Sequence, residues 1–136
     1  NLMMLPWTCQ WVKKAGLRLP AVDAAGETTI GGVAVLIDGA RLLMANDTGV
    51  GHVAAARRTP SVIVACGSDV ARWMPLDTAR HRVLHHDTEC RPCAHVRCPI
   101  DHPCARGVAA DTVIETALEL LSRLPAAPRR LDACAG

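Results

Sequence analysis

The chain has 136 residues, and half of them are apolar, so it can bury the core of one domain and lacks the composition of a disordered protein. Its net charge of +2 comes from 15 basic and 13 acidic residues, and it has no Phe or Tyr and only three Trp. Scattered basic residues without aromatic partners argue against nucleic-acid binding. We find no apolar run long enough to span a membrane and no signal-peptide pattern. Because position 1 is not Met, we expect a piece of a longer protein.

Short apolar runs bounded by turn residues predict strands, whereas apolar residues three or four apart predict helices. The predicted strands are residues 17–22, 41–45, 61–66 and 82–85. The predicted helices are residues 6–15, 30–37 and 52–58, and a last one from Asp111 onward. Residues 67–77 and 87–107 are expected to be loops, and residues 125–136 a disordered tail.

Two of these helices have recognisable caps and apolar faces. Thr28 or Thr29 is expected to cap the helix over 30–37, and Asp111 to cap the last one. The expected apolar faces consist of Ile30, Val33, Leu36 and Ile37 in the first, and Val113, Ile114, Ala117, Leu118 and Leu121 in the second.

The alternation of strands and helices predicts an α/β fold, a Rossmann-like parallel sheet with flanking helices. A complete sheet of this kind has five or six strands, as a rough guide, and this chain supplies fewer. The sequence therefore predicts an incomplete domain whose other strands lie upstream.

The segment most suggestive of function is residues 46–52, Asn-Asp-Thr-Gly-Val-Gly-His, between a buried strand and a helix. In parallel sheets this junction lies at the ligand-binding edge, and a helix start offers free N–H groups to an anion. Gly49 and Gly51 allow a close backbone approach, and the Thr48 hydroxyl adds a donor. Asp47 suits sugar hydroxyls or a metal better than a phosphate. The same letters also fit an ordinary turn with an N-cap, in which His52 has no role.

The chain resembles glycosyltransferase family 9, the lipopolysaccharide heptosyltransferase type, over about residues 22–122. The resemblance rests on Asp47-Thr48-Gly49, His52 with Ala54-Ala55-Ala56, Thr59-Pro60, Gly67, Arg72-Trp73-Met74-Pro75, and the run from Cys90-Arg-Pro-Cys93 to Cys104. It implies the C-terminal, donor-binding half of a two-domain GT-B enzyme. Residues 1–124 would then form a partial nucleotide-sugar-binding domain.

The resemblance implies an inverting sugar transfer from a nucleotide diphosphate donor such as ADP-heptose to the lipopolysaccharide core, without a metal or other cofactor. Donor binding would fall to Asp47 for the sugar, to Thr48, Gly49, Val50 and Gly51 for the diphosphate, and to His52 beside the phosphates. The general base and the acceptor contacts would come from the other domain, so that this chain contains no catalytic residue and is inactive alone. The family also implies a cytoplasmic location, with peripheral association at the inner membrane.

A different class of function follows from the cysteines. Cys90, Cys93, Cys98 and Cys104, with His95 and His102 nearby, provide enough ligands for a zinc ion, although their spacing is not that of a standard zinc finger. The alternatives are therefore a small zinc-stabilised binding module, or an inactive remnant, since Val50 and Gly51 depart from the family's motif.

Overall fold

The computed structural model describes residues 24, 26–95 and 97–123, so the helix expected at 6–15, the strand at 17–22 and the tail at 125–136 lie outside it. The described helices are α2 (Ile30–Gly39), α3 (Gly49–Arg57), α4 (Val70–Trp73), α5 (Pro103–Arg106) and α6 (Ala110–Arg123). The strands are β1 (Leu43–Asn46), β2 (Ser61–Ala65) and β3 (His81–His85).

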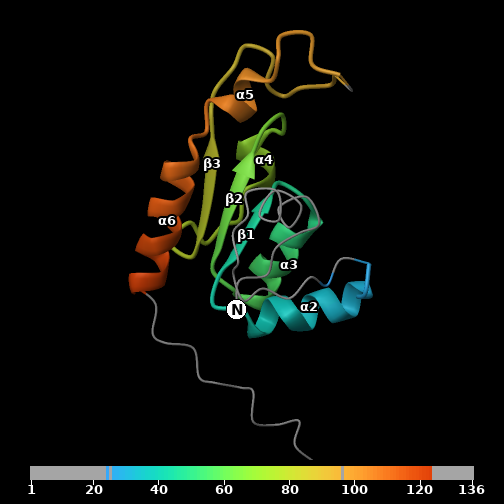
Figure 1. The fold of residues 1–136 in the computed structure, drawn as a ribbon, viewed down its shortest axis with the longest axis vertical. Helices are drawn as coiled ribbons and strands as arrows, with labels where there is room; N and C mark the ends of the chain where they lie inside the picture. The colour runs from blue at the N-terminus through green and yellow to red at the C-terminus, as the bar shows by residue number, and fades with distance from the viewer. Residues whose placement is uncertain (1–23, 25, 96, 124–136) are drawn as a thin grey trace, which may run out of the picture.

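The three strands form a parallel sheet in the order β1-β2-β3. Leu43 pairs with Ser61, which in turn pairs with His81. All three strands therefore start at the same end of the sheet, and their carboxyl ends lie together at the other end. Figure 1 shows α6 on one face of the sheet and α2 and α3 on the opposite face. The predicted α/β fold with a parallel sheet and flanking helices is confirmed.

Alternation along β1 sends neighbouring side chains to opposite faces. Leu43 packs with Ile37 of α2 and Ala54 of α3, whereas Leu42, just before the strand, packs with Ala117 and Leu120 of α6. An aliphatic core therefore lies on each face of the sheet, as the lack of Phe and Tyr requires.

Helix α2 begins where the sequence predicts. The Thr29 hydroxyl accepts from the N–H of Gly32 at 3.2 Å, so Thr29, and not Thr28, is the cap. The expected apolar face is only partly buried: Ile37 is fully buried, but Ile30 is 81% exposed and Leu36 44%. Helix α2 packs against α3 from Val33 onward, whereas its first residues extend beyond the sheet.

Helix α6 buries part of the predicted face. Ala117 is buried and Val113 and Leu121 pack against the core, together with Leu120, which was not predicted. Ile114 and Leu118, in contrast, are 51% and 61% exposed. The helix also begins at Ala110, which places Asp111 in its first turn instead of at its cap. The two exposed residues line an apolar groove of about 310 Å³ with Leu42 and Met44, beside the outer edge of β1. They are exposed because β1 is an outer strand, and no further described strand lies beside it to cover them.

The two expected loops each contain one helical turn. Asp69 caps α4 by accepting from the N–H of Arg72, and Pro103 begins α5. Four-residue helices give no periodic pattern, so the sequence did not reveal them.

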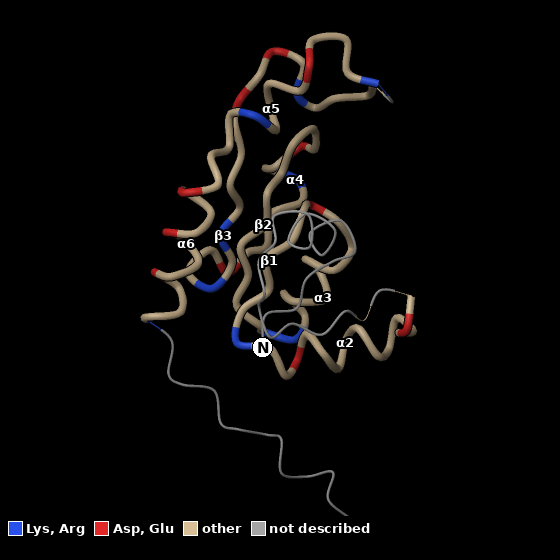
Figure 2. The backbone as a smooth tube through the Cα atoms, in the orientation of Figure 1, with Lys and Arg blue, Asp and Glu red and all other residues tan. Residues whose placement is uncertain are grey.

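Charges are spread along the described part of the chain. In Figure 2, acidic and basic residues are scattered along the described backbone, without a long run of basic residues. No described helix combines the length and the apolar character that crossing a membrane requires.

Candidate functional site

The first element of the candidate site is Asp47, which follows β1 directly. Its backbone N–H donates to the carbonyl oxygen of Val64 at 3.0 Å, which continues the ladder between β1 and β2 by one residue. The side chain of Asp47 is half-buried at the edge of the sheet where the parallel strands end. The sheet therefore fixes the backbone of Asp47, from which the carboxylate projects.

The second element is the start of α3. The helix begins at Gly49, three residues earlier than predicted, so Gly49, Val50 and Gly51 form its first turn. The N–H of Gly51 donates to the carbonyl of Thr48 at 3.0 Å, while no described residue accepts from the N–H of Gly49 or Val50. These two donors remain available to a ligand or to water.

Thr48 is the N-cap residue, but its side chain does not cap the helix. Its hydroxyl instead makes a long contact of 3.4 Å with the carbonyl of Asn46, and the residue is exposed. The hydroxyl therefore has no strong partner and can turn toward a ligand.

The two glycines of the motif have different surroundings. A Cβ on Gly49 would meet nothing within 4 Å, whereas a Cβ on Gly51 would lie 3.1 Å from Cδ1 of Ile63. Gly51 is buried against β2, so its small size serves helix-to-sheet packing. Only Gly49 combines open space with a free N–H.

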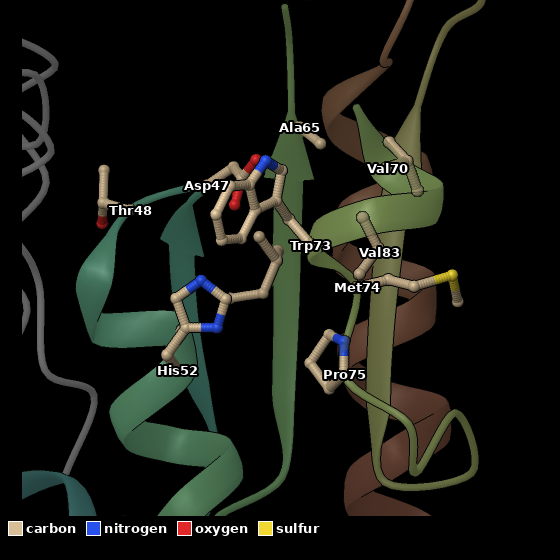
Figure 3. A pocket seen from close by; sticks show the side chains of 11 residues that line it. Asp47, Thr48, His52, Ala65, Val70, Trp73, Met74, Pro75 and Val83 are labelled. Carbon is tan, nitrogen blue, oxygen red and sulfur yellow. The ribbon is translucent and has the colours of Figure 1, made fainter. Parts of the chain in front are cut away.

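A small hollow joins these elements to the segment after β2. Its closed part measures about 10 Å³, roughly the space of one water molecule, so a larger ligand would lie across its mouth. The lining side chains come from the motif, from β2 and β3, and from the α4 region: Asp47, Thr48, Gly51, His52, Ile63, Ala65, Val70, Trp73, Met74, Pro75 and Val83. Figure 3 shows Thr48 and His52 on one side of the view and Met74 and Pro75 on the other, with the Trp73 indole between them and overlapping Asp47.

Trp73 belongs to this site, although the sequence analysis gave it no role. Its ring meets the exposed His52 ring edge to face, with centroids 6.1 Å apart and planes at 61°. The guanidinium of Arg72 lies 5.1 Å from the indole centroid. Trp73 is one of only three Trp in the sequence, and the fold determines which side chains surround it.

The segment of residues 87–107, called here the Cys-rich loop, reaches the carboxyl end of β2. Arg91 donates from Nη2 to the carbonyls of Ala65, at 2.8 Å, and Cys66, and the N–H of Cys93 donates to Gly67 at 2.7 Å. Burial raises the pKa of the Cys66 thiol; Cys104 and Asp47 act in the same direction and Arg91 opposes them. The loop is thus fastened beside the candidate site.

The cysteines themselves do not converge. Among the described residues, no group of three or more His, Cys, Asp or Glu side chains is placed as ligands around a metal would be. The sulfur of Cys98 accepts from the N–H of His102 at 3.1 Å, and that of Cys90 contacts the Thr88 hydroxyl at 3.5 Å. Local contacts account for these thiols, and the geometry gives no support to the zinc-stabilised module.

Comparison with known proteins identifies the family of the chain. Residues 9–103 match glycosyltransferase family 9, described as heptosyltransferase. Over 81 residues the chain is 28% identical to lipooligosaccharide heptosyltransferase 2 of Campylobacter jejuni, covering 59% of this chain and 25% of that protein. The chain thus spans a quarter of the length of this relative, and no solved structure matches it. The matched segment includes the whole of β1, α3 and β2, and the chain belongs to glycosyltransferase family 9.

Proposed function

We propose that this chain is the donor-binding part of an inverting glycosyltransferase that uses an ADP-heptose-like nucleotide sugar. The observation that carries the proposal is that a carboxylate and unpaired backbone N–H groups lie together where the parallel strands end. Asp47 lines the same hollow as the first turn of α3, where the N–H groups of Gly49 and Val50 have no described partner.

The division of roles follows from charge. A diphosphate suits the positive end of α3, because N–H donors and the helix dipole both stabilise negative charge. A carboxylate repels phosphate but accepts hydrogen bonds from sugar hydroxyls. Asp47 is therefore assigned to the donor sugar, Thr48, Gly49 and Val50 to the diphosphate, and His52 to the rim of the site. Gly51 supports the turn by its packing.

The same arrangement suits metal-free transfer. As the bond to the sugar breaks, negative charge grows on the nucleoside diphosphate that leaves, and preorganised N–H donors stabilise it. The proposal assigns the general base, and the contacts to a lipopolysaccharide core acceptor, to a further domain outside this chain. It places the protein in the cytoplasm, acting peripherally at the inner membrane.

Calorimetric titration with ADP and with ADP-heptose tests this assignment. We compare the unchanged protein with Asp47→Asn, which removes the charge but keeps the shape. Glu115→Gln on α6 is the matched control, because it removes the same charge from an exposed residue on the opposite side of the sheet.

We expect Asp47→Asn to weaken ADP-heptose at least about tenfold, as for a lost charge-assisted hydrogen bond, and to leave ADP binding nearly unchanged. Glu115→Gln should bind both ligands as the unchanged protein does. Failure of the unchanged, folded protein to bind either ligand would contradict the proposal and would favour an inactive remnant.

A further inference from the structure

The hollow beside Asp47 is lined by two chemically different sets of side chains. Asp47, Thr48 and His52 supply its polar groups. Trp73, Met74 and Pro75, from the segment that follows β2, supply a large apolar part of its lining. Trp73 is 49% exposed and Met74 38%, so a large apolar surface faces solvent next to a carboxylate. A ligand with one polar and one apolar side would fit here.

The indole of Trp73 is held in place. The backbone N–H of Trp73 donates to the Asp69 carbonyl at 3.2 Å, and Asp69 also caps α4 through its side chain. Arg72 stacks on the ring from 5.1 Å but does not line the hollow, so it supports the indole from another side. The His52 ring adds an edge-to-face contact from α3. The ring thus has contacts to side chains from two separate elements, α3 and α4.

We propose that Trp73 is the wall against which the sugar ring of the donor lies, and this inference rests on the proposed function. A pyranose carries C–H groups on its faces and hydroxyls around its rim. The C–H hydrogens are slightly positive and suit the negative face of an indole. Asp47, which lines the same hollow, accepts from the hydroxyls at the rim.

The order of groups in the donor distinguishes the sugar from the nucleobase. The sugar is bonded directly to the diphosphate, whereas the ribose separates the base from it. Trp73 lines one hollow with Asp47 and with the first turn of α3, the position assigned to the diphosphate. The group nearest to the diphosphate therefore occupies the Trp73 wall. Because the closed space is about 10 Å³, the sugar ring lies over the indole at the mouth.

The test is a comparison of ADP and ADP-heptose binding in Trp73→Ala and Trp73→Phe, each measured by calorimetry. Trp73→Ala removes the wall and should weaken ADP-heptose by about tenfold while ADP binding stays within about twofold. Trp73→Phe keeps a flat aromatic face and should recover most of the loss. Leu76→Ala, at a fully exposed position in the same segment, is the control and should change neither affinity.

The outcomes separate this inference from the function on which it rests. If Trp73→Ala weakens ADP and ADP-heptose equally, Trp73 stacks on the base or only supports the fold, and the inference is wrong while donor binding stands. If Trp73→Ala changes neither affinity, the inference is equally wrong. If the unchanged protein binds neither ligand, the proposed function itself fails.

A second measurement observes the ligand contact in the unchanged protein. The three Trp give three indole N–H resonances, and a spectrum of Trp73→Phe identifies that of Trp73. Saturating this resonance in the unchanged protein should transfer magnetisation to the sugar-ring protons of bound ADP-heptose. Transfer to the adenine protons instead would overturn the proposal.

Discussion

Gly51 and Ile63 are in such close contact that a Cβ added to the glycine would lie 3.1 Å from Cδ1 of the isoleucine. This contact joins the first turn of α3 to the middle of β2. It holds the first turn of α3 close to the sheet, and a larger residue at position 51 would displace this turn. Gly49, two residues earlier, has open space around it.

Substituting valine at the two glycines should therefore have different effects. Gly51→Val forces two methyl groups against Ile63, and we expect it to lower the free energy of unfolding by about 1–3 kcal/mol. Gly49→Val should change it by less than about 0.5 kcal/mol, since valine is a slightly better helix former than glycine. Urea denaturation followed by circular dichroism measures both, and equal effects would contradict the packing role of Gly51.

The cap of α2 gives a second test. Thr29→Ala removes the hydroxyl that accepts from Gly32, and should lower the free energy of unfolding by about 1 kcal/mol. Thr28→Ala, at the exposed neighbouring position, is the matched control and should change it by a few tenths. The same denaturation experiment measures both variants. A larger loss of unfolding free energy in Thr28→Ala would refute the assignment of Thr29 as the cap.

A buried histidine should make stability depend on pH. His81 is 3% exposed, and its Nδ1 lies 2.8 Å from Oγ of the fully buried Ser61. Burial lowers the pKa of His81; Asp77 opposes this and Arg80 adds to it. The neutral ring is thus the form that the folded state prefers.

Stability due to His81 is complete above its unfolded pKa of 6.5 and is lost as the pH falls below that value, because the unfolded state binds the proton more readily. We expect the free energy of unfolding to decrease between pH 7 and pH 5. One proton limits the slope to about 1.4 kcal/mol per pH unit. His81→Gln should flatten this profile, whereas His95→Gln, at an exposed position, should not. Identical profiles for the two variants would show that His81 does not set the slope.

The cysteines give a prediction about metal content. Because the described cysteine and histidine side chains do not converge, protein purified without a chelator should carry well below one equivalent of zinc. EDTA should leave its thermal unfolding temperature unchanged. Mass spectrometry of the metal content, together with a melting curve, checks this. About one equivalent of zinc with a chelator-dependent loss of stability would restore the zinc-stabilised module.

Much of the frame follows from local patterns. The run from Ser61 to Ala65 is apolar, β-branched and bounded by Pro60 and Gly67, and it forms the central strand. Thr29 caps its helix, and the motif lies between β1 and α3. The chemistry of the motif residues remains a prediction, because donor binding is a property that neither the pattern nor the fold measures.

Other features needed the tertiary structure. The face of α6 that is buried depends on where the sheet ends: Leu120 meets the core, while Leu118 extends past β1 into the groove. Residues spaced three and four apart look alike along a helix, so the periodicity alone could not choose between these two stripes.

The sequence by itself determined the family, the order of strands and helices and the position of the Asp47 motif, because each depends on neighbouring residues in the chain. The tertiary structure decided that Trp73 stands beside His52 and lines the hollow with Asp47. These residues are brought together by the parallel pairing of β1 with β2, which aligns the carboxyl ends of two distant segments. The proximity of these residues depends on the register of the sheet, and no local sequence pattern specifies that register.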